Sequence, residues 1–317
     1  MSENDFALSQ PSERLSASGY LKQNTGQRED ALSQFILKSY RRRKWVSRTL
    51  ILGLGLAAII VLTPLFSVFG YVLVQGLPAL NLEFFTQLPK PVGEVGGGMA
   101  NSLLGTLLLI VIASSIGVPW GILTGLYLSE YSPSKRAGFI RYCTDVLASI
   151  PSIIIGLFIY AIVVIPMKRF SALAGGIALG LLMIPTVARS TEELLKMVPQ
   201  HLREAGLALG IPRWKVTLFI ILRGSVGAIA TGVILAVARV SGETAPLLFT
   251  ALNSRLWPTG VDQPISSLPV QIYTYAVAPY DDWHQKAWAG ALVLVLLVFL
   301  VNLITRILLA PAQRRGH

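Results

Sequence analysis

The stretch ARVSGETAPLLF, residues 238–249, interrupts an apolar run that is otherwise long enough to cross a membrane. Arg239 and Glu243 stand four residues apart, so a continuous helix would carry both side chains on one face. A charge at the bilayer centre costs at least about 2.5–3.5 kcal/mol, so such residues normally face a bundle interior or a water-filled cavity. Pro246 has no N–H, and a helix broken beside it exposes backbone groups that only protein or water can satisfy. The stretch predicts a polar interruption that faces a transport pathway or a subunit interface.

Two hydroxyl side chains, Ser241 and Thr244, add polar groups to the same stretch. Together with Arg239 and Glu243 they are candidates for lining a pathway. The alternative interpretation is a structural salt bridge between Arg239 and Glu243 that only fixes the register of the helix.

The composition places most of the chain in lipid. Of the 317 residues, 53% are hydrophobic and 14% are charged, whereas a soluble domain has roughly a quarter charged residues. The mean hydropathy is +0.61. The net charge is +11, but the basic residues lie between apolar runs, which favours a role in membrane topology over nucleic-acid binding. We predict an all-α integral membrane protein that binds membrane lipid and no nucleic acid.

Six apolar runs approach or exceed the length of about twenty residues that a membrane-spanning helix needs. Five of them cover approximately residues 49–74, 99–128, 142–165, 173–188 and 287–309, and another lies within residues 216–250. An even number of spans places both termini on one side of the membrane. Basic residues concentrate in the segments on that side, including residues 41–48 and 196–215, so the positive-inside rule predicts cytoplasmic termini.

No motif indicates a catalytic or metal site. The sequence lacks a G-x-x-x-x-G-K-[ST] phosphate-binding loop, an H-E-x-x-H helix and a G-x-S-x-G turn. His201, His284 and His317 are scattered, and Cys143 is the single cysteine, which excludes an intrachain disulfide. We predict no catalytic residue, no metal ligand and no cofactor in this chain.

The loop PQHLREAGLALGIPRW, residues 199–214, predicts a short helix of about a dozen residues bracketed by two prolines. Leu202, Ala205, Gly206 and Leu209 fall on one face, and Arg203 faces elsewhere. The helix is too short to span a membrane, so it either lies on the membrane surface or docks into a groove of a protein partner. Its small residues favour docking, because they let another surface approach the backbone closely.

This loop resembles the coupling loop of the integral-membrane subunits of ABC importers, which has the form E-A-A-x-x-x-G, nine residues, then I-x-L-P. The corresponding residues are Glu204, Ala205, Gly206 and Gly210, followed by Ile220 through Arg223, with Arg223 in place of the proline. The resemblance implies that Glu204, Ala205, Gly206 and Gly210 contact a separate cytosolic ATPase, which carries the ATP and magnesium.

The segment ARVSGETAPLLFTA also resembles the signature of PstA-type permease subunits of phosphate ABC importers, and the likeness covers about residues 96–311. It implies six transmembrane helices in the type I (MetI-like) importer architecture within a bacterial inner membrane. In that family intramembrane arginines are associated with phosphate passage. By position these are Arg239, with Glu243 as its partner, and Arg189. The fork of an arginine side chain suits an oxyanion stripped of water.

The resemblance also implies a domain organisation and a set of partners. Residues 1–45 are expected to form a cytoplasmic tail with an amphipathic basic segment, residues 46–97 the first transmembrane helix and an outer loop, and residues 98–312 the permease core with the coupling loop. The expected partners are a second, PstC-type permease subunit, two copies of the ATPase, an extracytoplasmic phosphate-binding protein and phosphate itself.

The sequence leaves three other functions open. These are a permease for another oxyanion such as sulfate or molybdate, an ion-coupled secondary transporter that needs no ATPase, and a membrane protein that signals phosphate status without transport. Phosphate uptake measured with and without the ATPase separates these functions.

Overall fold

The computed structural model describes residues 11–94 and 96–314, and every regular element in that part of the chain is helical. Residues 1–10 of the expected tail, and His317 at the carboxyl terminus, lie outside the described residues. The chain divides into two compact units, Met1–Phe69 and Gly70–His317.

The first unit carries most of α1 (Pro11–Gly76), a single helix of 66 residues. It continues without a break through residue 45, where the sequence suggests a boundary between tail and first span. Its apolar side chains from residue 45 onwards are largely exposed, as at Leu52 and Val61. A helix that is apolar all round suits lipid rather than water.

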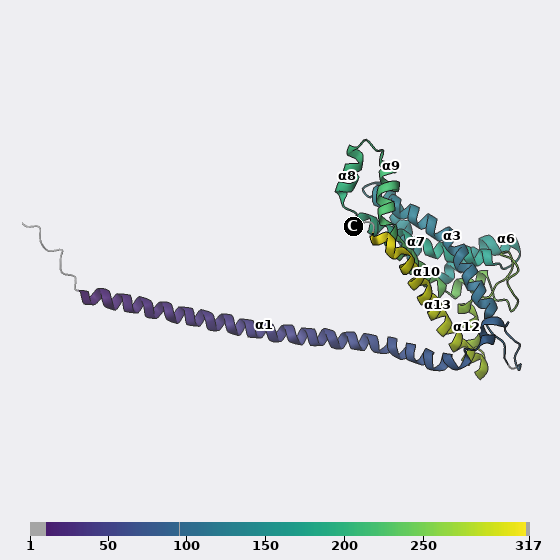
Figure 1. Ribbon diagram of the computed structural model, residues 1–317, viewed down its shortest axis with the longest axis horizontal. Coiled ribbons are helices and arrows are strands. Elements are labelled where there is room, and N and C mark those ends of the chain that lie inside the picture. Colours follow the sequence, from purple (N-terminus) through teal and green to yellow (C-terminus); the bar gives the residue numbers. More distant parts are fainter. Residues whose placement is uncertain (1–10, 95, 315–317) are drawn as a thin grey trace, which may run out of the picture. The chain divides into compact units, whose positions relative to one another are not determined.

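The second unit is built around α3 (Ala100–Glu130) and α7 (Ala172–Lys196), which pack in parallel along almost their whole length (Figure 1). Glycines four residues apart on α3 allow this close approach, because they carry no side chain between the two backbones. Gly117 lies against Met183, Gly121 against Val187, and Gly125 against Ala188 and Thr191. This G-x-x-x-G-x-x-x-G pattern is present in the sequence, but the sequence interpretation did not predict the helix pairing from it.

Other helices surround this pair. α10 (Arg223–Ser241) packs on α7 and on α13 (Asp281–Arg314), and α12 (Leu268–Ala276) packs on α13. In Figure 1, α8 (Gln200–Ala208) and α9 (Arg213–Lys215) lie at one end of the second unit and α12 at the opposite end. The carboxyl end of α13 lies towards the α8 end.

The end that carries α12 is held by buried polar contacts to the first turns of α3. The backbone N–H of Leu268 donates to Oγ1 of Thr106 at 2.8 Å, and the hydroxyls of Ser102 and Ser266 are 2.7 Å apart. Gly105 faces the backbone of Ser266 so closely that no side chain fits between them. Short helices complete this end, namely η1 (Leu77–Ala79) and α2 (Leu82–Thr86).

Within the described residues, five helices are long and apolar enough to cross a membrane, or six if one bent pair counts as a span. The five cover Arg43–Ala79, Ala100–Glu130, Ala172–Lys196, Arg213–Ser241 and Asp281–Ile304. The bent pair joins Lys135–Ser149 to Ser152–Met167 at an angle of 100°. The prediction of an all-α protein with six apolar membrane segments is confirmed in this form.

Three predicted spans differ from the structure in their details. The third, expected as one helix over residues 142–165, is instead α4 (Lys135–Ser149) followed after Pro151 by α5 (Ser152–Ile159), the π-helical segment η2 (Tyr160–Val164) and α6 (Ile165–Met167). Proline disfavours helical conformation in the residue before it, which explains the break at Ile150.

The fourth predicted span ends too early, and the fifth begins earlier than predicted. The fourth helix continues past residue 188 to Lys196, and hydropathy missed its last two turns because they carry charged residues. The fifth begins at α9, ahead of the predicted range 216–250, passes through the π-helical segment η3 (Val216–Leu222) and ends within that range at Ser241. Arg223 therefore lies inside a continuous helix, so the replacement of the family's proline does not interrupt it.

Candidate functional site

The polar stretch ARVSGETAPLLF, residues 238–249, forms a break between two helices. α10 ends at Ser241, and α11 (Ala245–Thr250) begins after three intervening residues. Pro246 lies in the first turn of α11, where its missing N–H needs no helical partner. The chain leaves the helix at Gly242, whose carbonyl is the one that a proline at position 246 deprives of its helical partner. The prediction of an interrupted helix in this stretch is confirmed.

A cavity of about 180 Å³ lies beside this break. Three parts of the chain build it: the bend between α4 and α5, the middle of α7, and the carboxyl end of α10. Its lining residues are Leu147, Ala148, Ile150, Pro151, Ser152, Leu182, Pro185, Thr186, Arg239 and Glu243. Both charged residues of the stretch therefore line one polar cavity, together with two hydroxyl-bearing side chains.

Arg239 and Glu243 share the cavity without pairing. Among the ion pairs of the described residues, none joins Arg239 to Glu243. Glu243 lies beyond the last residue of α10, so the two side chains do not share a helix face as the spacing suggested. The interpretation of a salt bridge that fixes helix register is therefore wrong. Arg239 is exposed and Glu243 half-buried, which leaves both charges available to a third group.

Ser241 and Thr244 have structural roles in the break. Ser241 is buried, and its hydroxyl donates to the carbonyl of Val237 in its own helix at 2.6 Å. Thr244 is the residue that precedes α11, and its carbonyl accepts the N–H of Leu247 at 3.1 Å. Neither residue belongs to the cavity lining, so the structure brings Arg239 and Glu243 together there and leaves these two hydroxyls outside.

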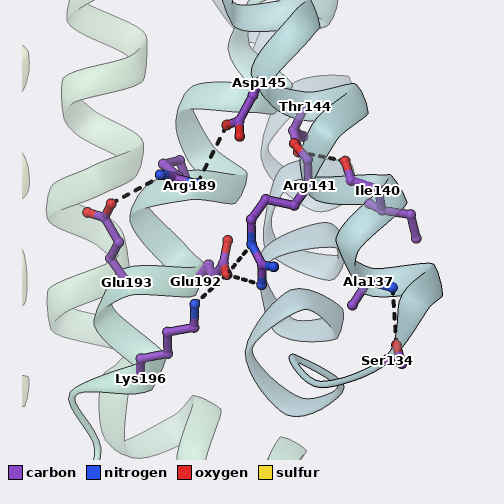
Figure 2. Close-up of polar contacts among 10 residues, drawn as sticks. All are labelled: Ser134, Ala137, Ile140, Arg141, Thr144, Asp145, Arg189, Glu192, Glu193 and Lys196. Carbon is purple, nitrogen blue, oxygen red and sulfur yellow. Dashed lines mark hydrogen bonds and ion pairs between the residues drawn. The ribbon is translucent and has the colours of Figure 1, made fainter.

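Arg189 lies further along the face of α7 that lines the cavity. Leu182, Pro185 and Thr186 belong to the lining, and Arg189 follows Thr186 by three residues, the spacing of one helical face. Figure 2 shows its side chain between two carboxylates, Asp145 of α4 and Glu193 of α7. The contacts measure 3.5 Å from Nη1 to Asp145 and 3.3 Å from Nε to Glu193. All three side chains are more than half exposed, so these pairs are weak and exchangeable.

The predicted coupling helix is α8, with nine residues instead of about twelve. It ends in a Schellman motif: the N–H of Gly210 donates to the carbonyl of Leu207 at 2.9 Å, and that of Ile211 to the carbonyl of Gly206 at 3.3 Å. Gly210 has a φ of +75°, the left-handed conformation that glycine adopts at least cost. The glycine four residues after Gly206 therefore serves as the helix stop.

The other residues predicted to contact an ATPase divide into a buried and an exposed set. Gly206 is buried, and an added Cβ would lie 2.9 Å from a methyl group of Val216. Glu204, Ala205 and Leu209 are exposed, Leu209 by 79%. α8 thus packs on η3 through Gly206 and leaves a face free.

Arg203 is a structural residue whose partners the sequence interpretation missed. It was expected to face away from Leu202, Ala205 and Leu209, and it anchors α8 to two other helices. Its Nη2 donates to the carbonyl of Leu195 at 3.0 Å, and its Nη1 to that of Val198 at 3.2 Å. Its Nε donates to Glu130 at the end of α3, at 3.2 Å. No local signal in the sequence indicates the contact with Glu130, which is 73 residues away.

A second cluster that sequence reasoning missed centres on Glu192 of α7. Figure 2 shows Arg141 of α4 and Lys196 of α7 converging on the carboxylate of Glu192. Arg141 Nη2 and Lys196 Nζ each lie 2.6 Å from Oε1 of Glu192. The carboxylate is 2% exposed. Hydropathy does not show that a charged residue near the end of an amphipathic helix is buried. The i, i+4 spacing of Glu192 and Lys196 does fit a helical ion pair.

Comparison with known proteins agrees with this architecture. Residues 117–314 match the family described as binding-protein-dependent transport system inner membrane component. The chain is 47% identical over 240 residues to the phosphate transport system permease protein PstA of Yersinia pestis, covering 75% of this chain and 81% of that protein. It is 45% identical over 260 residues to PstA of Haemophilus influenzae, covering 81% and 92% respectively.

A solved structure shares the fold. A chain of the MetNI methionine ABC transporter, in an inward-facing conformation, superimposes with a TM-score of 0.54 at 19% identity. The likeness covers 67% of this chain and 93% of that one. The prediction of a MetI-like helical architecture is confirmed.

Proposed function

Because the chain belongs to the family of binding-protein-dependent transport system inner membrane components, and within it to the PstA-type permeases, we propose that it is the permease subunit of an ATP-driven phosphate importer. It is a multi-pass inner membrane protein and a transport subunit rather than an enzyme. The single observation that carries the proposal is the polar cavity that holds Arg239 and Glu243 beside a broken helix.

The cavity has the chemistry that phosphate passage requires. Arg239 presents a planar, permanently charged donor fork, which suits a phosphate oxyanion that has lost part of its water. Glu243 lines the same cavity without neutralising Arg239, and its negative charge opposes tight anion binding. Passage needs binding that is favourable enough for arrival and weak enough for departure. Arg189, weakly held by Asp145 and Glu193, offers a second donor fork further along α7.

The partners follow from the division of labour in such an importer. A separate cytosolic ATPase, in two copies, binds ATP and magnesium and docks on α8 through its exposed residues, Glu204 and Ala205 among them. Gly206 and Gly210 shape that helix. A PstC-type permease completes the membrane pair, and an extracytoplasmic binding protein delivers phosphate. This assembly places α8 and both termini in the cytoplasm.

The proposal is tested by phosphate uptake into vesicles that contain the assembled importer, with and without its ATPase. Uptake is expected only with the ATPase, and Arg239→Gln is expected to abolish it while assembly is retained. The matched control is Arg169→Gln, which removes an exposed ion pair with Asp262. Persisting uptake without ATPase would instead indicate ion-coupled transport, and sulfate or molybdate uptake in place of phosphate would indicate another oxyanion. Absence of any uptake would favour a signalling role.

A further inference from the structure

Glu192, Arg141 and Lys196 form a link between α4 and α7, which we call the clasp. Oε1 of Glu192 receives both cations, with Arg141 Nε at 3.0 Å in addition to Nη2 at 2.6 Å. A buried carboxylate depends on such partners, because removal of both would leave its charge uncompensated in a poorly solvated place. Glu192 lines neither the cavity beside Arg239 nor the exposed face of α8.

On one side, the clasp lies next to the segment that connects α7 to α8. Arg203 of α8 donates to the carbonyls of Leu195 and Val198, which flank Lys196 at the end of α7. A displacement of α8 therefore pulls on the last turn of α7, the turn that holds Lys196. Only Met197, Val198 and Pro199 separate α7 from α8.

On the other side, helix α4 connects the clasp to the cavity. Ser134 caps α4 by accepting the N–H of Ala137 at 3.1 Å (Figure 2). The helix continues without a break to Ser149. Arg141 and the cavity-lining Leu147 thus lie on one rigid helix, about 9 Å apart along its axis. The Arg189–Asp145 contact joins the same two helices one turn nearer the cavity.

We propose that Glu192 is the positioning residue through which movement of α8 reaches the cavity that holds Arg239 and Glu243. The proposal rests on the proposed function, because it takes α8 as the docking site of the ATPase. Movement of the docked ATPase displaces α8, Arg203 carries the displacement to the end of α7, and Glu192 passes it to Arg141 and so to α4. The bend after α4 forms one wall of the cavity, so its position sets the cavity's shape.

The test measures ATP hydrolysis and phosphate uptake on the same proteoliposomes containing the complete importer. The quantity of interest is phosphate imported per ATP hydrolysed. Arg141→Met removes the guanidinium and leaves Glu192 paired with Lys196, so folding is preserved. Coupling between sites typically spans a factor of about 5 to 150, so we expect this ratio to fall about ten-fold while hydrolysis continues.

Two further variants separate positioning from general stability. Arg141→Lys restores a cation at the same place and is expected to recover the ratio in part. Glu192→Gln is expected to lower the ratio as Arg141→Met does, and the double variant to be no worse than either single variant, because both break one link. If Glu192→Gln does not assemble, Arg141→Met and its lysine counterpart decide the outcome.

The control is Arg169→Met, which breaks the exposed Arg169–Asp262 pair of 3.0 Å and is expected to leave the ratio unchanged. The proposal is overturned if Arg141→Met leaves the ratio at the wild-type value, or if uptake and hydrolysis decline in parallel. Wild-type importer that imports no phosphate would refute the proposed function instead, so the two failures are distinguishable.

Discussion

Gly156 of α5 lies directly against Pro246 of α11: an added Cβ would stand 2.6 Å from the Cα of Pro246. This contact joins the helix that follows the bend at Pro151 to the helix that follows the break at Gly242. Both interruptions border the cavity that holds Arg239 and Glu243, so the contact holds two of its walls together.

Gly156→Ala is therefore expected to destabilise the protein by about 1–3 kcal/mol, because the nearest neighbour is backbone and has little freedom to move. Thermal unfolding of the purified importer, followed by loss of monodisperse complex, measures the effect. Gly138→Ala in α4 is the control, since nothing lies within 4 Å of its added methyl group and alanine favours a helix. Equal melting temperatures for the two variants would contradict the prediction.

The parallel packing of α3 and α7 predicts a similar sensitivity at Gly121. An added Cβ would lie 2.6 Å from Cβ of Val187, a β-branched side chain with few alternative rotamers. Gly121→Ala is expected to lower the yield of folded protein in membranes and to cost about 1–3 kcal/mol. Gly224→Ala in α10, where no atom lies within 4 Å, is expected to retain the wild-type yield. A wild-type unfolding temperature for Gly121→Ala would show that the two helices separate at little cost.

Position 210 favours glycine because the backbone after α8 is left-handed, and not because space is short. Gly210→Ala places a Cβ at a φ of +75°, which costs roughly 1–2 kcal/mol, whereas Gly210→Asn is expected to cost less. Nothing lies within 4 Å of the added methyl group, so crowding is not a factor. Binding of the purified ATPase to the permease pair measures the effect. Similar losses for alanine and asparagine would point to direct contact with Gly210 instead.

The position of Arg189 predicts that donor geometry matters as well as charge. Arg189→Gln is expected to reduce phosphate uptake by at least about ten-fold, and Arg189→Lys by less, because lysine keeps the charge and loses the fork. The exposed pair with Asp145 contributes no more than about 1 kcal/mol to stability after solvent screening, so both variants are expected to unfold as the wild type does. Uptake assays and thermal unfolding on the same preparations check this. Wild-type uptake by Arg189→Gln would remove Arg189 from the pathway.

Local sequence signals were sufficient for the architecture. Hydropathy located the membrane helices because a spanning segment must be apolar over about twenty residues, whatever it contacts. The polar stretch around Arg239 and Glu243 predicted an interruption of the helix, since intramembrane charge and proline are costly unless a cavity accommodates them. The motif containing Glu204 and Gly210 marked α8. Hydropathy could not show the 100° bend after α4, because the two helices lie within a single apolar run.

The sequence by itself determined the class of the protein, its apolar helices and the two segments on which its proposed function depends. Only the tertiary structure decided which side chains meet. It separated Glu243 from the helix of Arg239, brought Thr186 and Ser152 to their cavity, and paired Arg141 with Glu192 across 51 residues. The physical reason is that hydropathy and capping act between neighbours in the chain. Ion pairs and cavities instead depend on helix packing, which here requires small residues such as Gly121 and Gly156 at points of close approach.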